Sequence, residues 1–198
     1  MRIHKINQQL RMPWKNGLGT STQIAISPES ADFTKGDFLW RISSAEIFND
    51  NLFSIFPNHD RILTHLSGGE LELSFQNNLK PNVLLKQHMI YSWNGAEQIQ
   101  CKLLGESATD LGIIYHRELI ETSMSIVTVS PMPQKILLKA EVNLIIPIED
   151  EIFFDGTKIL KLEALQIETP TNKLHEYSIR SSTRQASKLA LIQIRRRT

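Results

Sequence analysis

Residues 69–75 read Gly69-Glu70-Leu71-Glu72-Leu73-Ser74-Phe75, a strict alternation of polar and apolar side chains. Successive side chains of a β-strand point to opposite faces, so this period of two predicts a strand that is buried on one face. The apolar face carries Leu71, Leu73 and Phe75. Asn77-Asn78 follow directly and are typical of a turn.

The same pattern recurs along the whole chain. Short runs rich in Val, Ile, Leu, Phe and Thr end at Gly, Asn, Asp or Pro, whereas helical periodicity is nearly absent. In Phe153-Phe154-Asp155-Gly156-Thr157-Lys158, the Asp-Gly pair predicts a tight turn between two antiparallel strands. We expect further strands near residues 20–27, 38–48, 60–67, 97–104, 110–117, 123–130, 134–139, 142–147, 158–167 and 188–195. Their number and spacing indicate an all-β sandwich or barrel.

A chain of 198 residues with 41% hydrophobic composition can bury one large core or two smaller ones. The composition shifts to Ser, Met and Pro between Glu121 and Gln134. We interpret this stretch as the junction of two β halves, residues 1–120 and 121–198, within one protein spanning 1–198.

The charges nearly balance, with Lys+Arg 22 against Asp+Glu 21 and a formal net charge of +1. No positive surplus is left to neutralise phosphates, so neither nucleic acid nor an anionic membrane is an expected partner. The start of the sequence lacks the apolar core of a signal peptide, and no apolar stretch approaches the ~20 residues of a membrane span. We therefore expect a soluble, cytoplasmic protein. Its one cysteine, Cys101, lies on the apolar side of an alternating run and is expected to be a small core residue.

The first half contains three segments that are dense in polar and aromatic side chains, at residues 12–20, 40–46 and 53–61. In the first segment Trp14, Lys15 and Asn16 offer a ring, a cation and an amide from one loop, which could cap a pocket. The alternative is structural: Trp14 closes a barrel mouth, Lys15 is solvated and Asn16 holds a turn.

The second segment reads Trp40-Arg41-Ile42-Ser43-Ser44-Ala45-Glu46. A period of two places Arg41 with the small Ser43 and Ala45 on one face, where they would leave room for a ligand. Glu46 then belongs to the opposite face, so Arg41 and Glu46 cannot both face one cavity without a bulge. The alternative is a surface Arg41 with Glu46 buried in an ion pair.

In the third segment the same rule separates Asp60 from Arg61, so that one points inward and the other braces a neighbour or faces water. An arginine presents a planar fork of donors that matches a carboxylate at two points. If Lys15, Arg41 and Arg61 converge, the pocket is cationic and suits an acidic metabolite. The alternative for Asp60 and Arg61 is a salt bridge at the entry of a turn.

Together these three segments resemble the HutD/Ves family of bacterial bicupins, whose pattern runs close to MPWKNGGG, WR-S-AE and FS-FPG-DR. The chain departs from that pattern where the family favours Gly, Glu, Gly and Asn, at Leu18, Gln23, Asn58 and Gly112. The resemblance implies a bicupin with two double-stranded β-helix, jelly-roll-like halves in one chain. It also implies an association with histidine utilisation, and no established reaction.

Many cupins bind Fe, Mn or Zn through a His-x-His pair, a Glu and a later His, and no His-x-His occurs in this sequence. His59 and His65 could share one face of a strand, but ordinary metal sites use three or four ligands. The sequence also lacks Gly-x-Ser-x-Gly and the glycine-rich nucleotide loops. We therefore expect no metal, no cofactor and no covalent catalysis.

Three hypotheses follow. The leading one is a metabolite-binding bicupin that tunes a catabolic pathway, with a formylated glutamate or urocanate as examples of its ligand. In it Trp14 stacks on the ligand, Lys15, Arg41 and Arg61 hold carboxylates, and Asn16 and Glu46 meet amide or imidazole donors. The second is a metal-free enzyme with Glu46 as general base. The third is a protein that acts through partner contacts, as a homodimer or as a stress-response factor.

Overall fold

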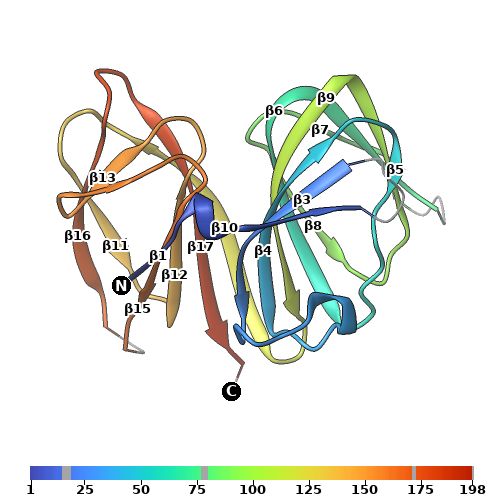
Figure 1. Cartoon of the computed structure of the whole chain (residues 1–198), viewed down its shortest axis with the longest axis horizontal. Coiled ribbons are helices and arrows are strands. Elements are labelled where there is room, and N and C mark those ends of the chain that lie inside the picture. Colours follow the sequence, from blue (N-terminus) through green and yellow to red (C-terminus); the bar gives the residue numbers. More distant parts are fainter. Residues whose placement is uncertain (15–18, 77–79, 171–172, 198) are drawn as a thin grey trace. The chain divides into compact units, whose positions relative to one another are not determined.

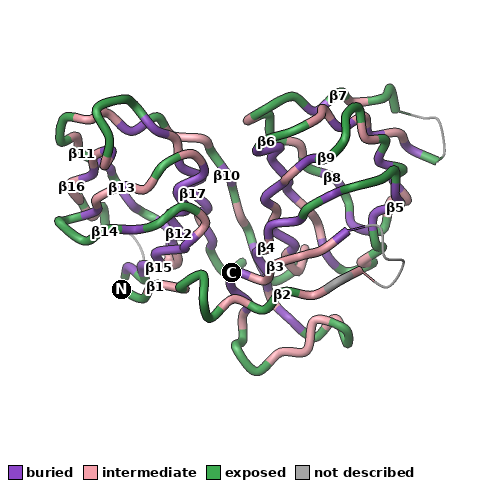
Figure 2. The backbone as a smooth tube through the Cα atoms, turned by 45° about the horizontal axis from the view of Figure 1, so that its top comes forward, coloured by how far each residue is buried: buried purple, intermediate pink, exposed green. Residues whose placement is uncertain are grey.

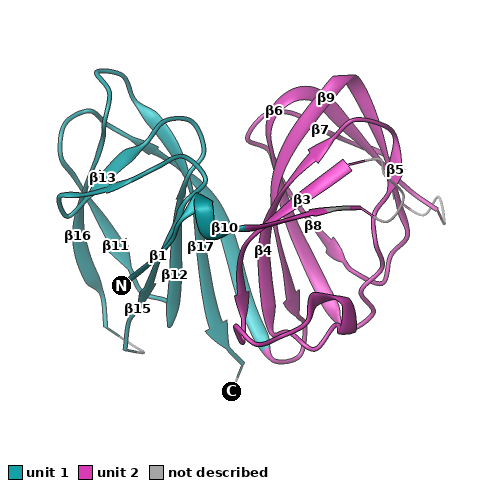
Figure 3. Cartoon of the chain, viewed as in Figure 1, with its two compact units in different colours: residues 1–9, 120–198 teal, residues 10–119 magenta. Residues whose placement is uncertain are grey.

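The computed structural model describes residues 1–14, 19–76, 80–170 and 173–197 (Figure 1). It confirms the all-β prediction: in this part of the chain the helical elements are two single 3-10 turns, η1 (Ile6–Gln8) and η2 (Phe33–Lys35). No helix in the described ranges has the length and apolarity that crossing a bilayer requires. The chain divides into two compact units, residues 10–119 and residues 1–9 with 120–198 (Figure 3).

The unit of residues 10–119 is built on an eight-stranded sheet. Its path runs β2-β3-β4-β9-β6-β7, with β5 added to β9 and β8 added to β6. The strands are β2 (Leu10–Pro13), β3 (Gly19–Ser27), β4 (Trp40–Ile47), β5 (Asn51–Leu52), β6 (His59–Phe75), β7 (Val83–Leu85), β8 (Ile90–Asn94) and β9 (Ile99–His116).

The long antiparallel strands β6 and β9 form the centre of this unit, pairing from His59↔His116 to Phe75↔Ile99. The register shifts between His65 and Ser67 and again between Gly68 and Glu70. Gly68 has a φ of +89°, and a Cβ there would lie 2.2 Å from the Ser107 carbonyl oxygen. Only glycine allows the two strands to approach this closely at the bend.

The predicted alternation at residues 69–75 is confirmed, because Leu71, Leu73 and Phe75 are buried in the second part of β6. They pack with Ile47, Leu63, Leu85, Trp93, Ile99 and Cys101, among others, in one apolar core. Cys101 is fully buried there, and this burial raises the pKa of its thiol to about 12. It is therefore a small core residue, as expected.

The unit of residues 1–9 and 120–198 contains two sheets, with orders β1-β15-β12-β17-β10 and β11-β16-β13-β14. Its apolar core draws on both sheets and includes Leu138, Ile145, Phe154, Leu165 and Leu189, and each unit has its own buried interior (Figure 2). The strands are β1 (Arg2–His4), β10 (Ile120–Val129), β11 (Gln134–Leu138), β12 (Val142–Pro147), β13 (Ile152–Phe154), β14 (Thr157–Ile159), β15 (Ala164–Glu168), β16 (His175–Ser181) and β17 (Ser187–Arg196).

Several strand predictions need correction. The two strands expected at 97–104 and 110–117 form the single strand β9, which continues through Gly105 at a φ of +153°. The strand expected at 158–167 is divided into β14 and β15, because Leu162 adopts a φ of +62° in a turn. No strand was predicted from the sequence at β1, β2, β5, β7, β8 or β16. The Asp155-Gly156 hairpin is confirmed: both residues have positive φ, and β13 pairs with β14 on either side.

Candidate functional site

A cavity of about 350 Å³ lies within the unit of residues 10–119. Its floor includes three adjacent strands, β4, β9 and β6. Ile114 of β9 is the register partner of both Arg41 on β4 and Arg61 on β6. Directly opposed residues project from the same face of a sheet, so the two arginines flank Ile114 at one end of this floor. All three residues line the cavity.

Between the arginines and the other end of the floor, small side chains leave the cavity open. Ser43 of β4 pairs with Gly112 of β9, and Ala45 pairs with Asp110. All four residues line the cavity. The expectation that Arg41, Ser43 and Ala45 share one face therefore agrees with the geometry, and Gly112 adds room because it has no side chain.

Arg41 is buried, with 3% of its surface exposed, and its hydrogen bonds go to neutral groups. Its Nε donates to Gln23 Oε1 at 2.9 Å and its Nη1 donates to Ser43 Oγ at 3.1 Å. The guanidinium carbon lies 3.9 Å from the centroid of the Phe33 ring. Within the described part of the chain Nη2 is buried without a hydrogen-bond partner. Burial, with the charge of Arg61 adding to it, lowers the pKa of Arg41 to about 10.

Arg61 lies against aromatic rings and bonds to a backbone carbonyl. Its guanidinium carbon is 4.7 Å from the ring centroid of Phe53 and 5.0 Å from that of Trp93. Nη1 donates to the carbonyl oxygen of Ser54 at 3.2 Å. Burial lowers the pKa of Arg61 to about 10, with the charge of Asp110 opposing the shift. Like Arg41, Arg61 remains a cation at neutral pH.

Asp110 is the acidic side chain among the described residues that line the cavity. It is 3% exposed, and its Oδ1 accepts a hydrogen bond from the Ala45 backbone N–H at 3.1 Å. Burial raises the pKa of Asp110 to about 7, although the charge of Arg61 and the Ala45 hydrogen bond act in the opposite direction. No direct ion pair links Asp110 to either arginine across the described residues. Its charge therefore only partly offsets theirs.

Trp14 lines the same cavity, next to Met12. The indole N–H donates to Ser21 Oγ at 2.8 Å, which fixes the ring. A Cβ at Gly19 would lie 2.8 Å from the Trp14 ring and 2.6 Å from the Glu46 carbonyl oxygen, so the position requires glycine. Two further expected site residues, Lys15 and Asn16, lie outside the described residues.

Glu46 does not line the cavity. It forms an ion pair with Arg11 and accepts a hydrogen bond from Thr20, and about half of its side chain is exposed. The alternation of β4 explains this position, because Glu46 is an odd number of residues from Arg41. The structure thus brings Trp14, Arg41 and Arg61 to one cavity and leaves Glu46 outside it.

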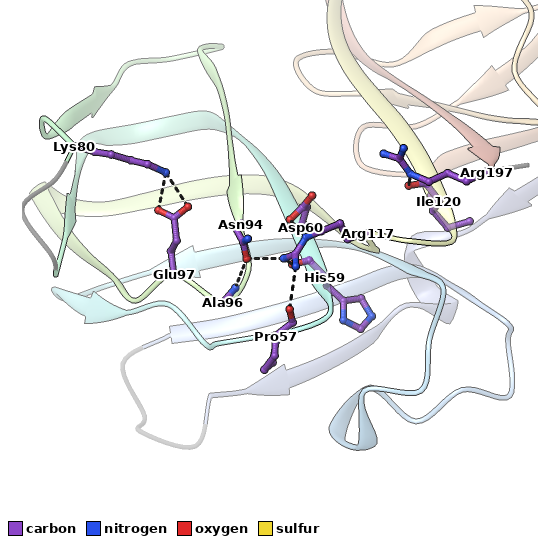
Figure 4. Close-up of polar contacts among 10 residues, drawn as sticks. All are labelled: Pro57, His59, Asp60, Lys80, Asn94, Ala96, Glu97, Arg117, Ile120 and Arg197. Carbon is purple, nitrogen blue, oxygen red and sulfur yellow. Dashed lines mark hydrogen bonds and ion pairs between the residues drawn. The ribbon is translucent and has the colours of Figure 1, made fainter.

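Arg117 fixes the segment that leads into Arg61 (Figure 4). Its Nε donates to Asp60 Oδ1 at 2.8 Å, and its Nη atoms donate to the carbonyl oxygens of Pro57 and His59 at 3.2 and 2.9 Å. A further bond goes to Asn94 Oδ1. Asp60 therefore braces a neighbour, whereas Arg61 lines the cavity.

His59 and His116 are register partners whose ring centroids lie 5.3 Å apart, and neither of them lines the cavity. His59 is buried and its Nε2 lies 3.1 Å from the Phe38 carbonyl oxygen, while His65 is buried further along β6. Neither lines the cavity. Across the described ranges, no three His, Cys, Asp or Glu side chains group as metal ligands would.

Two residues at or beside the cavity, Asp110 and Gln23, were not among the expected site residues. Asp110 is an acid within the alternating apolar run of β9, and that position is the signal that could have identified it. Gln23 precedes a register shift between β3 and β4, which the sequence pattern does not reveal.

Solved structures of similar fold cover the whole chain or nearly so. A conserved protein of unknown function from Pseudomonas aeruginosa has a TM-score of 0.84 at 21% identity, covering 100% of this chain and 99% of that one. HutD from Pseudomonas fluorescens has a TM-score of 0.83 at 23% identity, with the same coverage. An oxalate decarboxylase from Bacillus subtilis has a TM-score of 0.68 at 6% identity, covering 96% of this chain and 76% of that one. By its fold, this chain is a cupin-like β protein.

The chain belongs to the HutD family, whose model matches residues 7–188. It is 36% identical over 105 residues to a 21.2 kDa protein in the hutC 3′ region of Pseudomonas putida, 53% of each chain. It is 33% identical over 106 residues to protein Ves from Citrobacter koseri, 53% of this chain and 52% of that one. The matched region spans about half the length of these curated relatives.

Proposed function

We propose that this protein is a bicupin that binds a small acidic metabolite and serves as an accessory or regulatory protein of histidine utilisation, in the cytoplasm. The place of a similar Pseudomonas putida protein in the hutC 3′ region supports the pathway. The division into two compact β units, each with its own core, supports the bicupin architecture.

One observation carries the proposal: two buried or partly buried arginines share a cavity, and their hydrogen bonds go to neutral acceptors. Arg41 bonds to an amide and a hydroxyl, and Arg61 bonds to a backbone carbonyl. Burying two cations is unfavourable and Asp110 offsets their charge only in part, so a carboxylate that enters between the arginines relieves the remaining cost. The fork of an arginine also matches a carboxylate in geometry.

The rest of the cavity suits a small organic acid. A volume of about 350 Å³ lies at the lower end of the range typical of small-molecule sites. Aromatic side chains, Trp14, Phe33, Phe53 and Phe56, supply apolar contact beside the polar groups. Glu46, the base that the enzyme hypothesis requires, lies outside the cavity, so these observations favour binding over catalysis.

Thermal shift with acids of histidine breakdown, including N-formyl-L-glutamate and urocanate, tests the proposal. A ligand at ~100 times its dissociation constant stabilises the folded state by about 2.7 kcal/mol through mass action. For a protein of this size, that corresponds to a rise in melting temperature of roughly 5–10 °C. At least one acid should give such a shift.

Arg61→Ala should abolish the shift, because the ligand carboxylate would lose its partner in a partly dry pocket at a cost of roughly 2–5 kcal/mol. Arg11→Ala is the matched control, since it removes the same charge from an exposed side chain of the same unit. Circular dichroism must first establish that Arg61→Ala folds. A folded Arg61→Ala that keeps the full shift, or a wild type that responds to none of the acids, would contradict the proposal.

A further inference from the structure

Asp110 lies at the end of the cavity floor opposite to the arginines. Along β9 it is four residues from Ile114, which Arg41 and Arg61 flank, and the register between the three strands is unbroken over this stretch. At about 3.3 Å per residue, the two ends of the floor are about 13 Å apart at the backbone. The long arginine side chains shorten the distance that a ligand has to span.

One oxygen of this carboxylate remains available to a ligand. Oδ1 accepts the Ala45 N–H, and Oδ2 accepts no hydrogen bond from the described residues. Asp110 itself lines the cavity, so a ligand there lies next to this carboxylate. Gly112, between Asp110 and Ile114, presents no side chain that would block this approach.

We propose that Asp110 determines specificity in this cavity, accepting a hydrogen bond from an N–H group of an acid whose carboxylate is bound by Arg41 and Arg61. The inference rests on the proposed function and adds to the ligand an N–H group at the end opposite to its bound carboxylate. A carboxylate only accepts hydrogen bonds, so Asp110 pairs with an amide or imidazole N–H. A second ligand carboxylate at this position would instead be repelled unless a proton were taken up.

The groups around Asp110 make this residue the one that titrates near neutral pH. Arg41 and Arg61, with pKa values of about 10, stay charged, and Cys101, with a pKa of about 12, stays protonated. His65 is the register partner of Asp110 on β6, and burial lowers its pKa below the usual value, which favours the neutral imidazole. Asp110, with a pKa of about 7, therefore loses its proton between pH 6 and 8.

Binding should consequently depend on pH in opposite ways for two acids. N-formyl-L-glutamate has an amide N–H in addition to its two carboxylates and needs Asp110 ionised to accept that N–H, so its affinity should rise about tenfold from pH 6 to 8. Glutarate has the same two carboxylates and no N–H to offer Asp110, so its affinity should fall over the same range. Neither probe changes its own charge appreciably in this window.

Isothermal titration of both probes at pH 6, 7 and 8, on wild type and Asp110→Asn, tests the inference. The asparagine side chain of the variant can still accept the Ala45 N–H, but its amide N–H₂ would face the ligand donor. The variant should bind N-formyl-L-glutamate at least about tenfold more weakly at pH 8, with no dependence on pH. The wild type alone gives a second readout, the opposite pH trends of the two probes.

The outcomes separate the two proposals. If wild type binds N-formyl-L-glutamate and Asp110→Asn has the same affinity and pH profile, Asp110 does not determine specificity and only this inference is overturned. The same holds if both probes follow one pH trend in wild type. If neither probe binds wild type at any pH, the proposed function is overturned and the inference with it.

Discussion

Gln23 keeps the Arg41 charge available to a ligand. Its amide oxygen satisfies the Nε of Arg41 at 2.9 Å without neutralising the guanidinium. A glutamate of nearly the same shape would satisfy the same donor and also cancel the charge. The cavity can therefore attract a carboxylate because this partner is an amide and not an acid.

Gln23→Glu should weaken the binding of N-formyl-L-glutamate by about tenfold or more, since the new carboxylate competes with the ligand for Arg41. Isothermal titration of the folded variant measures the change. Gln185→Glu, an exposed position in the other unit, makes the same charge change and should leave the affinity unaltered. Equal affinities for Gln23→Glu and wild type would show that Arg41 does not bind the carboxylate.

Asp110 should make stability depend on pH in the absence of ligand. Its folded-state pKa of about 7 lies above the usual value of 3.8, so the folded protein binds its proton more tightly than the unfolded chain. Protonated Asp110 therefore contributes stability that is fully present below the unfolded-state pKa and is lost as the pH rises through the folded-state pKa of about 7. Above pH 7 the ionised, buried carboxylate destabilises the fold.

Asp110→Asn removes this ionisation and should be more stable than wild type at pH 8 by on the order of 4 kcal/mol, with the difference vanishing near pH 4. Urea unfolding at a series of pH values measures it. A difference that is constant over this range would mean that Asp110 does not titrate there.

The sequence pattern identified the two cavity arginines but not Asp110, and the reason is physical. Strand alternation places Arg41 with Ser43 and Ala45, and separates Arg61 from Asp60, without knowledge of the fold. Asp110 becomes part of the site only because β9 pairs between β4 and β6, which sets Ala45 opposite to it. Such long-range register is not encoded in any local pattern.

At the scale of the elements, the Arg117 network connects the end of β9 with the start of β6 and with β8. It joins Asp60, Asn94 and the carbonyls of Pro57 and His59 through one guanidinium (Figure 4). Arg61 follows directly after Asp60, so this network positions the cavity arginine without touching a ligand.

Arg117→Gln should destabilise the protein by about 1 kcal/mol, because partly exposed carbonyl and carboxylate acceptors lose a charged donor. It should also weaken ligand binding, since the segment of residues 54–60 loses its fixed position. Hydrogen exchange should detect faster exchange in this segment, with Arg11→Gln as an exposed control. Unchanged exchange there would contradict the positioning role.

The sequence located most strands but not their continuity. Apolar alternation identifies residues 60–67 and 69–75 separately, whereas the structure joins them in β6 through bulges at Leu66 and Gly69. Likewise the sequence pattern predicts that a strand ends at Gly105, yet β9 continues through it. Glycine marks both a turn and a bulge, and only pairing with the neighbouring strand distinguishes them.

On the scale of the whole molecule, the two compact units each bury their own core. The cavity and all of its described lining residues belong to residues 10–119. Ligand binding should therefore protect strands β4, β6 and β9 from hydrogen exchange and leave the core of the other unit unchanged.

Leu138→Ala probes this separation, since Leu138 is fully buried in the core of the unit of residues 1–9 and 120–198. The cavity created should cost about 2–5 kcal/mol of stability. The dissociation constant for N-formyl-L-glutamate should stay within about twofold of wild type while the variant is folded, as isothermal titration would measure. A large loss of affinity would mean that the two units are coupled at the ligand site.

The central claim is that Arg41 and Arg61 together bind a carboxylate, and a crystal structure of the complex with N-formyl-L-glutamate tests it most directly. We expect ligand density in the cavity, with one carboxylate within hydrogen-bond distance of Arg41 Nη2 and of the Arg61 guanidinium. Ligand bound elsewhere on the molecule, or in the cavity with its carboxylates turned away from both arginines, would contradict the claim.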